Sequence, residues 1–250
     1  MGRAEGTVPH SRLRETGPVR TPPLPTVPSR TVLWDVDGTL LLNSTKAGTF
    51  YHDAIREVAG VGPAPDEPHA VEHGKTDAQI ITERLERWGG DPALFGAVSA
   101  RMDELSDAYL TDAARRVAAP GVDDALHAVA GAGWTNGLLT GNSRHRARVK
   151  LAGAGLDVDA FDWDRSYFGD RFVRRSDLTA AARDDLDGAT AVILGDTPAD
   201  GEAADAVGFP FVAVATGVYS VEDLRATSAV VVVPDLVEGL PLVLEALGRL

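Results

Sequence analysis

Four aspartates lie at the ends of two apolar runs in this sequence. Asp35 and Asp37 follow one run, in "TVLWDVDGTLL", and Asp196 and Asp200 follow another, in "GDTPAD". If the fold brings the two runs side by side, these carboxylates repel one another unless a cation lies between them. Carboxylates without His or Cys suit a hard ion such as Mg²⁺, which commonly acts together with a substrate phosphate. The pattern therefore predicts a magnesium site that handles phosphate.

A third segment, "LLTGNS", supplies neutral groups suited to an anion. Thr140 offers a hydroxyl, and the backbone amides from Gly141 to Ser143 precede a helical pattern, whose N-terminus favours a bound anion. Acids, a metal and an anion site together indicate phosphoryl transfer. In this scheme one of Asp35 and Asp37 attacks phosphorus, and the other handles the proton of the leaving group.

Runs of strand length alternate with helical patterns along the part of the chain that carries these motifs. The expected strands are 31–35, 134–140, 191–196, 209–216 and 229–233. The expected helices lie near 121–131, 143–153, 177–187, 199–206 and 235–248. This alternation predicts an α/β fold with a Rossmann-like parallel sheet flanked by helices, and a ligand site beyond the carboxyl ends of the strands.

The segment 44–118, between the first two expected strands, is too long for an ordinary crossover and carries mainly helical patterns. We expect a helical cap domain inserted after the first strand, over the end of the sheet. Its expected helices lie in 46–60, 76–89 and 92–118. The α/β core then comprises 30–43 and 119–250, and residues 1–29, rich in proline and arginine, are expected to form a flexible tail.

The acidic composition excludes several classes of partner. Asp and Glu number 37 against 24 Lys and Arg, which gives a formal net charge of -13 and disfavours nucleic acid and anionic membranes. The chain has no cysteine, and no apolar run approaches the about 20 residues that span a bilayer. We expect a cytoplasmic protein that acts on a small phosphorylated metabolite, with no nucleic-acid or membrane partner; its oligomeric state stays open.

The motifs "DVDGTL", "LLTGN" and "GDTPAD", in this order with a helical insert after the first, resemble the haloacid dehalogenase (HAD) superfamily. Within it, the sequence is most similar to the phosphoglycolate phosphatase-like branch. The resemblance covers roughly residues 31–248 and implies a phosphatase that works through an aspartyl-phosphate. It also implies that Asp35 is the nucleophile and that Asp37 is the acid and base.

The same resemblance assigns further roles. Thr140 and Asn142, with Gly141 between them, would hold the phosphoryl group. The implied Mg²⁺ ligands are Asp35, the main-chain carbonyl of Asp37, Asp196 and, through water, Asp200. The segment "DTPAD" also has the pattern of a helix start, and helix capping is compatible with metal binding.

One cation departs from the family pattern. The family usually supplies a lysine between the second and third motif strands, whereas "FGDRFVRRSDLTAAA" has none. We assign this role to Arg175, with Arg174 as the alternative, although arginine and lysine differ in geometry. Lys150 lies one helix earlier and is expected at the surface. A "GKTD" segment occurs in the cap of the resembling phosphatases, so Lys75 either reaches the substrate or is a solvated loop residue.

Other functions use the same core. A phosphosugar mutase differs mainly in the cap. A 2-haloacid dehalogenase has no leaving group that needs a proton, which would leave Asp37 without a purpose. A non-catalytic phosphate-binding module is the alternative from another class, in which the missing lysine marks lost activity. The sequence predicts a Mg²⁺-dependent phosphatase of a small phosphomonoester and does not name the substrate.

Overall fold

The computed structural model describes residues 2, 29–43, 47–67, 72–111 and 115–250. The predicted tail, 1–29, lies almost wholly outside these ranges and stays a prediction. No helix in the described ranges is long and apolar enough to cross a bilayer.

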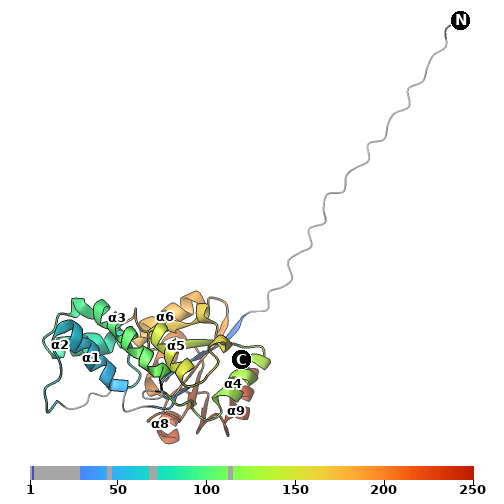
Figure 1. The fold of residues 1–250 in the computed structure, drawn as a ribbon. Coiled ribbons are helices and arrows are strands. Elements are labelled where there is room, and N and C mark those ends of the chain that lie inside the picture. Colours follow the sequence, from blue (N-terminus) through green and yellow to red (C-terminus); the bar gives the residue numbers. More distant parts are fainter. Residues whose placement is uncertain (1, 3–28, 44–46, 68–71, 112–114) are drawn as a thin grey trace.

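Six parallel strands form the centre of the described fold, in the order β3-β2-β1-β4-β5-β6 (Figure 1). They are β1 (Arg30–Trp34), β2 (Thr135–Thr140), β3 (Tyr167–Phe168), β4 (Thr190–Gly195), β5 (Phe211–Val214) and β6 (Val231–Val233). The predicted parallel α/β sheet is thus confirmed. Sequence reasoning missed β3, because two residues are too few to form an apolar run.

Both faces of the sheet are buried, and β1 shows how. Val32 and Trp34 belong to the hydrophobic cluster on one face, whereas Leu33 belongs to the cluster on the other, as the two-residue period of a strand requires. The first cluster includes side chains of α4 (Val122–Gly131), α5 (Arg144–Gly153) and α9 (Leu240–Gly248). The second includes side chains of α6 (Arg175–Asp185), α7 (Pro198–Val207) and α8 (Val221–Arg225).

Two helix boundaries differ from the prediction. α6 begins at Arg175, two residues earlier than expected, and this places the arginine at the edge of the sheet. α9 begins at Leu240 rather than near 235, since Pro241 favours the first turn of a helix. α8 was not predicted because a five-residue helix carries too little periodicity.

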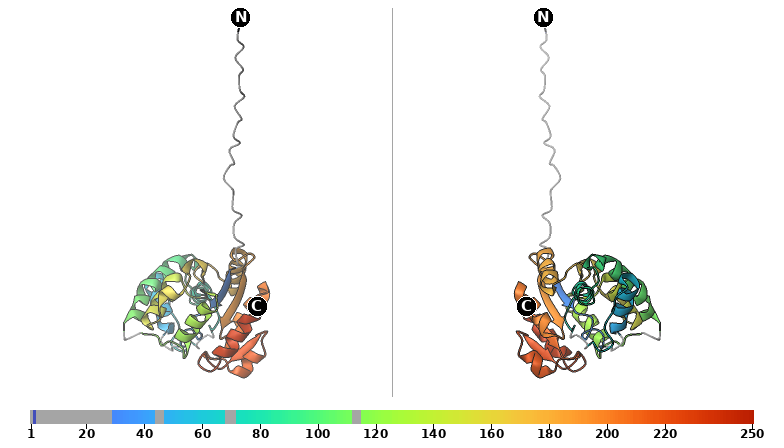
Figure 2. Two further views of the ribbon diagram at one scale, coloured as in Figure 1. Left: turned by 90° about the vertical axis from the view of Figure 1, so that its right-hand side faces the viewer. Right: turned by 90° about the vertical axis from the view of Figure 1, so that its left-hand side faces the viewer.

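A group of helices lies to one side of the sheet (Figures 1 and 2). This group, called the helical insert below, consists of α1 (Ala47–Ala59), α2 (Asp77–Arg87), η1 (Pro92–Leu94), α3 (Phe95–Ser106) and η2 (Asp107–Leu110). It has a hydrophobic cluster of its own, to which Ile55, Leu85 and Met102 contribute. The predicted helical run 92–118 was too long. α3 ends at Ser106, η2 ends at Leu110, and the described residues between Leu110 and residue 118 are not helical.

The chain leaves and re-enters the core along one narrow path. The amide of Leu42 donates to the carbonyl of Val117 at 2.9 Å, and the amide of Ala119 donates to the carbonyl of Leu40 at 2.9 Å. The outgoing and returning segments therefore lie side by side. The limits proposed for the cap domain, 44–118, stay a prediction because residues 44–46 and 112–114 lie outside the described ranges.

Candidate active site

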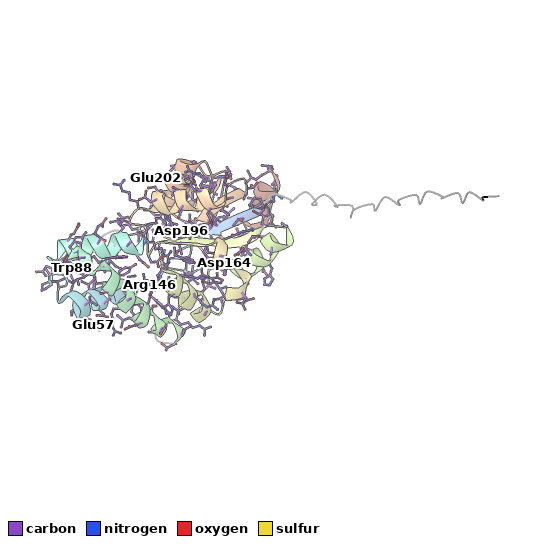
Figure 3. All side chains as sticks on the ribbon, turned by 90° about the horizontal axis from the view of Figure 1, so that it is seen from above. Glu57, Trp88, Arg146, Asp164, Asp196 and Glu202 are labelled. Carbon is purple, nitrogen blue, oxygen red and sulfur yellow. The ribbon has the colours of Figure 1, made fainter. Side chains whose placement is uncertain are left out.

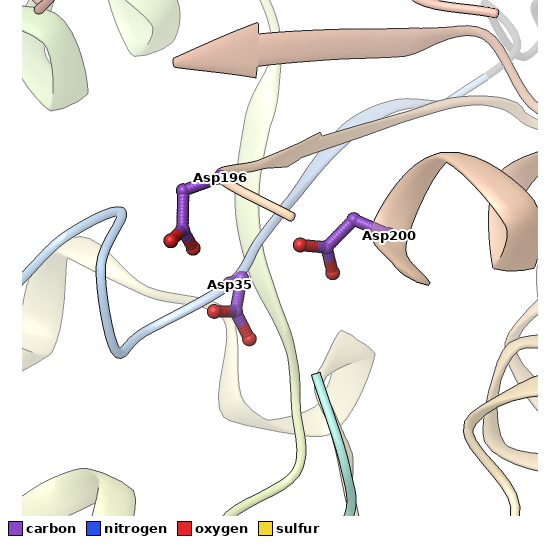
Figure 4. A group of neighbouring side chains, drawn as sticks. All are labelled: Asp35, Asp196 and Asp200. Carbon is purple, nitrogen blue, oxygen red and sulfur yellow. The ribbon is translucent and has the colours of Figure 1, made fainter. Parts of the chain in front are cut away.

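Three aspartates meet where β1 and β4 end (Figure 4). Asp35 directly follows β1, and its amide donates to Leu194 of the adjacent β4 at 2.9 Å, so Asp35 and Asp196 leave neighbouring strands at the same edge. Asp200 comes from the first turn of α7. All three are buried, and one oxygen of each lies within 4.8 Å of the others. Asp35, Asp196 and Asp200 are called the acid triad below.

At the same edge of the sheet, the backbone at Gly38 lies close to the side chain of Asp196. Gly38 has φ +96°, and a Cβ at this position would overlap the Asp196 carboxylate. Only glycine avoids both the strain and the overlap. Thr39 then donates its hydroxyl to Asp196 Oδ1 at 3.2 Å. The turn after β1 is therefore shaped by the acid that it packs against.

Burial and neighbouring carboxylates raise the pKa values of Asp35 and Asp196. Burial, against the opposing effect of Arg175 and together with the neighbouring acids Asp200 and Asp37, raises the pKa of Asp35 to about 7. Burial, followed by the charges of Asp35 and Asp200, raises the pKa of Asp196 well above its usual range. Ionised together, these carboxylates therefore repel each other strongly.

The donor set fits a divalent cation. Among the described side chains, the cation in contact with the acid triad is Arg175, so three ionised carboxylates would exceed the positive charge by two. All candidate donors are oxygens, which hard ions such as Mg²⁺ prefer. The predicted ligands Asp35, Asp196 and Asp200 can therefore share one such ion. The predicted contact of the Asp37 main-chain carbonyl stays a prediction.

Arg175 occupies the first turn of α6 and is buried. Its Nη2 donates to Asp35 Oδ1 at 3.0 Å and to the Leu139 carbonyl at 3.3 Å, and it forms an ion pair with Asp200. Burial alone would lower the pKa of Arg175, but the carboxylates of Asp200 and Asp35 raise it. Arg174, the alternative in the sequence analysis, is exposed at the start of the helix. The geometry thus brings Arg175, and not Arg174, to the acid triad.

Asp37 does not belong to the acid triad and forms ion pairs with two cations. Its Oδ2 accepts from Lys150 Nζ at 2.8 Å and from Asn142 Nδ2 at 2.8 Å, while Oδ1 lies 2.9 Å from Arg116 Nη1. Burial raises the pKa of Asp37, but Lys150 and Arg116 outweigh it and hold the pKa below its usual range. Asp37 is therefore a carboxylate with a fixed orientation.

Lys150 was expected at the surface, and this expectation was wrong. The residue is 6% exposed, and its ammonium also donates to Asn142 Oδ1 at 2.6 Å. Lys150 lies one helical turn after Arg146 on α5, and residues four apart share a face of a helix. That face of α5 is turned toward the helical insert. No local signal distinguishes this pair from Arg144 and Arg148, which have the same spacing and are exposed.

The segment between β2 and α5 presents the groups predicted to hold an anion. Asn142 Nδ2 donates to Thr140 Oγ1 at 2.8 Å, and both side chains are buried. Ser143 caps α5 by accepting the Arg146 amide at 3.0 Å. A Cβ at Gly141 would overlap the carbonyl of Lys75, so glycine permits the helical insert to lie directly against this segment.

A buried ion-pair network joins the helical insert to α5, and sequence reasoning missed it. Arg146 Nε donates to Asp77 Oδ2 at 2.8 Å and Nη1 to Asp103 Oδ1 at 2.5 Å, and Figure 3 shows Arg146 between the insert and the sheet. The Ser143 amide donates to the same Asp77 oxygen at 2.9 Å. The Tyr51 hydroxyl also donates to Asp77. Three helices of the insert are thereby fixed to the start of α5.

A cavity of about 620 Å³ lies between the core and the helical insert. Asp35, Asp37, Thr140 and Arg175 line its core side. Lys75 lies in its wall, but its Nζ pairs with Glu83 Oε2 at 2.6 Å. The contact of Lys75 with a substrate, one of the two predicted alternatives, stays a prediction. The size is that of a pocket for a small organic molecule.

Comparisons with known proteins agree with this architecture. The family model for haloacid dehalogenase-like hydrolases matches residues 29–208. No curated protein matches the chain.

Solved structures with this fold include an HAD hydrolase, family IA, variant 3 from Entamoeba histolytica, with 17% identity, TM-score 0.66, and coverage of 88% of this chain and 100% of that one. A protein described as a predicted phosphatase, from Clostridium acetobutylicum, has 15% identity and TM-score 0.61, and the match covers 90% of this chain and 100% of that one. A β-phosphoglucomutase from Clostridium difficile has 16% identity, TM-score 0.60, and coverage of 88% and 98%. At these identities the likeness is one of fold.

Proposed function

The chain belongs to the haloacid dehalogenase-like hydrolase family, and from this premise we propose that it is a Mg²⁺-dependent phosphatase of small phosphomonoesters. The observation that carries the proposal is the acid triad beside Arg175, with the Thr140–Asn142 segment on the same cavity. A buried nucleophile, a metal-binding acid cluster and a group of anion-binding donors are the parts that phosphoryl transfer requires.

In the first chemical step, a carboxylate oxygen of Asp35 attacks phosphorus, and the bond from phosphorus to the ester oxygen breaks. Asp37 gives a proton to the departing oxygen, so the alcohol leaves neutral. Lys150 and Arg116 favour the ionised form of Asp37, whereas the arriving phosphate charge raises its affinity for this proton. The products of this step are the free alcohol and an aspartyl-phosphate at Asp35.

In the second step, water replaces Asp35 on phosphorus. Asp37 takes a proton from the water, which then attacks the phosphoryl group and releases Asp35 and inorganic phosphate. Contacts with Lys150, Arg116 and Asn142 hold the Asp37 carboxylate in one orientation for this role. The same residue thus acts as acid and base in succession.

Charge on the transferring phosphoryl group must be neutralised at the core side of the cavity. Mg²⁺ held by Asp35, Asp196 and Asp200 would supply this neutralisation at one phosphoryl oxygen. Arg175 supplies a fixed guanidinium that already contacts Asp35. The Thr140 hydroxyl and the Asn142 amide are the neutral donors for the other oxygens, whereas the Ser143 amide is already bonded to Asp77.

The test is hydrolysis of an aryl phosphate by the full chain, measured with Mg²⁺ and again with a chelator. We expect turnover with the metal and at least a 100-fold loss with the chelator, in the range that loss of an electrostatic catalyst produces. Asp35→Asn should reduce kcat by about 1,000-fold or more, since the substituted amide is a poor nucleophile.

Metal-independent turnover, or an Asp35→Asn variant with most of its activity, would contradict the mechanism. A protein that binds phosphate but never hydrolyses the ester would be the non-catalytic module considered in the sequence analysis. A protein that releases no inorganic phosphate but moves the phosphoryl group between positions of a sugar would be a mutase.

A further inference from the structure

The side of the cavity formed by the helical insert faces the organic part of any bound phosphomonoester. Its charged members are Lys75, Arg84, Arg87, Glu67, Glu72 and Asp77, and His73 is a further titratable member. Its apolar and aromatic members include Phe50, Tyr51, Pro63, Pro65, Ile80 and Trp88. These residues together are called the insert wall below. Because the phosphoryl group binds at the acid triad, the charge of the insert wall selects among organic groups.

Lys75 is a partly exposed cation of the insert wall, and a carboxylate already pairs with it. Its Nζ lies 2.6 Å from Glu83 Oε2 on α2. Gln79 Nε2 donates to the other oxygen of Glu83 at 2.8 Å and so fixes the carboxylate. The Lys75 side chain is 27% exposed, which leaves it accessible from the cavity but paired. An anion at Lys75 would have to displace Glu83 or be repelled by it.

The charge of Arg84 is paired with a carboxylate through two hydrogen bonds. Its Nε and Nη2 donate to the two oxygens of Glu72 at 2.9 and 2.6 Å, a bidentate pair. Its guanidinium carbon lies 4.8 Å from the ring centre of Tyr51 and 5.7 Å from that of Trp88. The remaining nitrogen, Nη1, is buried and has no hydrogen-bond partner among the described residues. It is enclosed by the protein and offers no donor to a ligand.

The remaining arginine of the insert wall is also paired with a carboxylate. Arg87 Nη1 lies 3.4 Å from Glu67 Oε1. Burial and the nearby Arg84 lower the pKa of His52, which packs edge-on against Trp88 at 5.4 Å, so its ring is neutral near pH 7. Among the described residues, each lysine or arginine of the insert wall therefore has its own carboxylate.

We infer that this phosphatase selects phosphomonoesters whose organic group is uncharged, and that the Lys75–Glu83 pair enforces this choice. The inference rests on the proposed function and adds the class of substrate. Apolar and aromatic side chains offer contact to a neutral organic group, whereas a carboxylate or second phosphate meets, among the described residues of the wall, no lysine or arginine without a carboxylate partner. The insert wall thereby discriminates by charge as well as by shape.

The test compares two ester pairs that differ by one carboxylate. The smaller pair is 2-hydroxyethyl phosphate and phosphoglycolate; the larger pair, which can reach the aromatic side chains, is benzyl phosphate and 4-carboxybenzyl phosphate. With Mg²⁺ present, kcat/KM should favour the neutral member of each pair by about tenfold, the effect expected from an uncompensated charge at a partly buried site.

Glu83→Gln is the decisive variant, since it frees Lys75 while keeping a side chain of the same shape. It should raise kcat/KM for the carboxylate members by about fivefold relative to the neutral ones. Glu86→Gln removes the same charge from an exposed position of α2 and should leave the ratio unchanged. Adding Lys75→Met to Glu83→Gln should return the ratio to the wild-type value.

A wild-type preference for the carboxylate esters would overturn the inference while leaving the phosphatase intact. An unchanged ratio in Glu83→Gln would overturn the role of the Lys75–Glu83 pair. If the protein hydrolyses no phosphomonoester with Mg²⁺, including the aryl phosphate, the proposed function fails and this inference fails with it.

Discussion

The two sides of the cavity treat charge in opposite ways. On the core side, three buried acids converge and Arg175 is the contacting cation, so negative charge is in excess. On the insert wall, Lys75, Arg84 and Arg87 each pair with a carboxylate of the insert itself. Unpaired buried charge lowers the stability of a fold, and it is typical of sites where a metal ion or a phosphate binds. On the insert wall, ion pairs stabilise the fold and, in our inference, disfavour a charged organic group.

Removing Arg175, the cation that contacts the acid triad among the described residues, should have the largest effect on activity. Arg175→Ala leaves the carboxylates of Asp35 and Asp200 without their partner, and the phosphoryl group without its guanidinium. We expect kcat/KM for an aryl phosphate to fall by about 100- to 1,000-fold. Arg175→Lys keeps the charge and should recover part of this loss. Wild-type activity in Arg175→Ala would place the phosphate-binding cation elsewhere.

Breaking the buried ion pairs of Arg146 should lower the stability of the fold more than it lowers activity per folded molecule. Arg146→Met leaves Asp77 and Asp103 facing each other across the boundary between insert and core, and we expect the free energy of unfolding in urea to fall by about 3 kcal/mol. The control is Arg101→Met, which breaks exposed pairs with Glu57 and Glu104 and should reduce the free energy of unfolding far less. Equal losses in the two variants would contradict the distinction.

Lys150→Met tests whether orientation of Asp37 matters. The substitution removes the ammonium from both Asp37 and Asn142. We expect kcat to fall by about 10- to 100-fold for alkyl phosphates, whose leaving groups need a proton, and much less for nitrophenyl phosphate. Arg148→Met, at an exposed position of α5, is the matched control. An equal loss with both types of ester would indicate a structural role for Lys150 instead.

The smallest expected effect is a gain in stability. Asp196→Asn removes one of the mutually repelling acids, so without metal the free energy of unfolding should rise by about 1 kcal/mol. Wild-type protein should be stabilised by Mg²⁺, by about 2.7 kcal/mol at 100 times Kd, and the variant should respond far less. Thermal unfolding with and without Mg²⁺ measures both. A variant less stable than wild type without metal would mean that the acids are not in conflict.

Much of the core was predictable because its signals are local. Five strands were expected near their observed positions, since a strand buried on both faces needs a continuous apolar run. Glycine and acids at the ends of such runs also marked the edge of the sheet where Asp35, Asp196 and Asp200 meet. The two-residue β3 and the five-residue α8 escaped because their conformation is set by neighbours rather than by periodicity.

The wrong expectation for Lys150 has a different origin. A lysine on a helix is usually solvated, and composition alone favours that expectation. Its burial depends on the insert covering one face of α5 and on Asp37 lying within reach of Nζ. Similarly, no local pattern distinguishes Arg175 from Arg174; the helix begins so that Arg175 faces the sheet.

The sequence by itself determined the parallel α/β core, the positions of its main strands along the chain and the acids at their ends, because backbone periodicity and turn chemistry act over a few residues. Tertiary structure alone decided which charges are matched. Pairs such as Lys150 with Asp37 and Arg146 with Asp103 join residues distant in the chain, and electrostatic energy depends on separation in space and on burial. That distribution of matched and unmatched charge underlies both the proposed catalytic centre and its proposed selectivity.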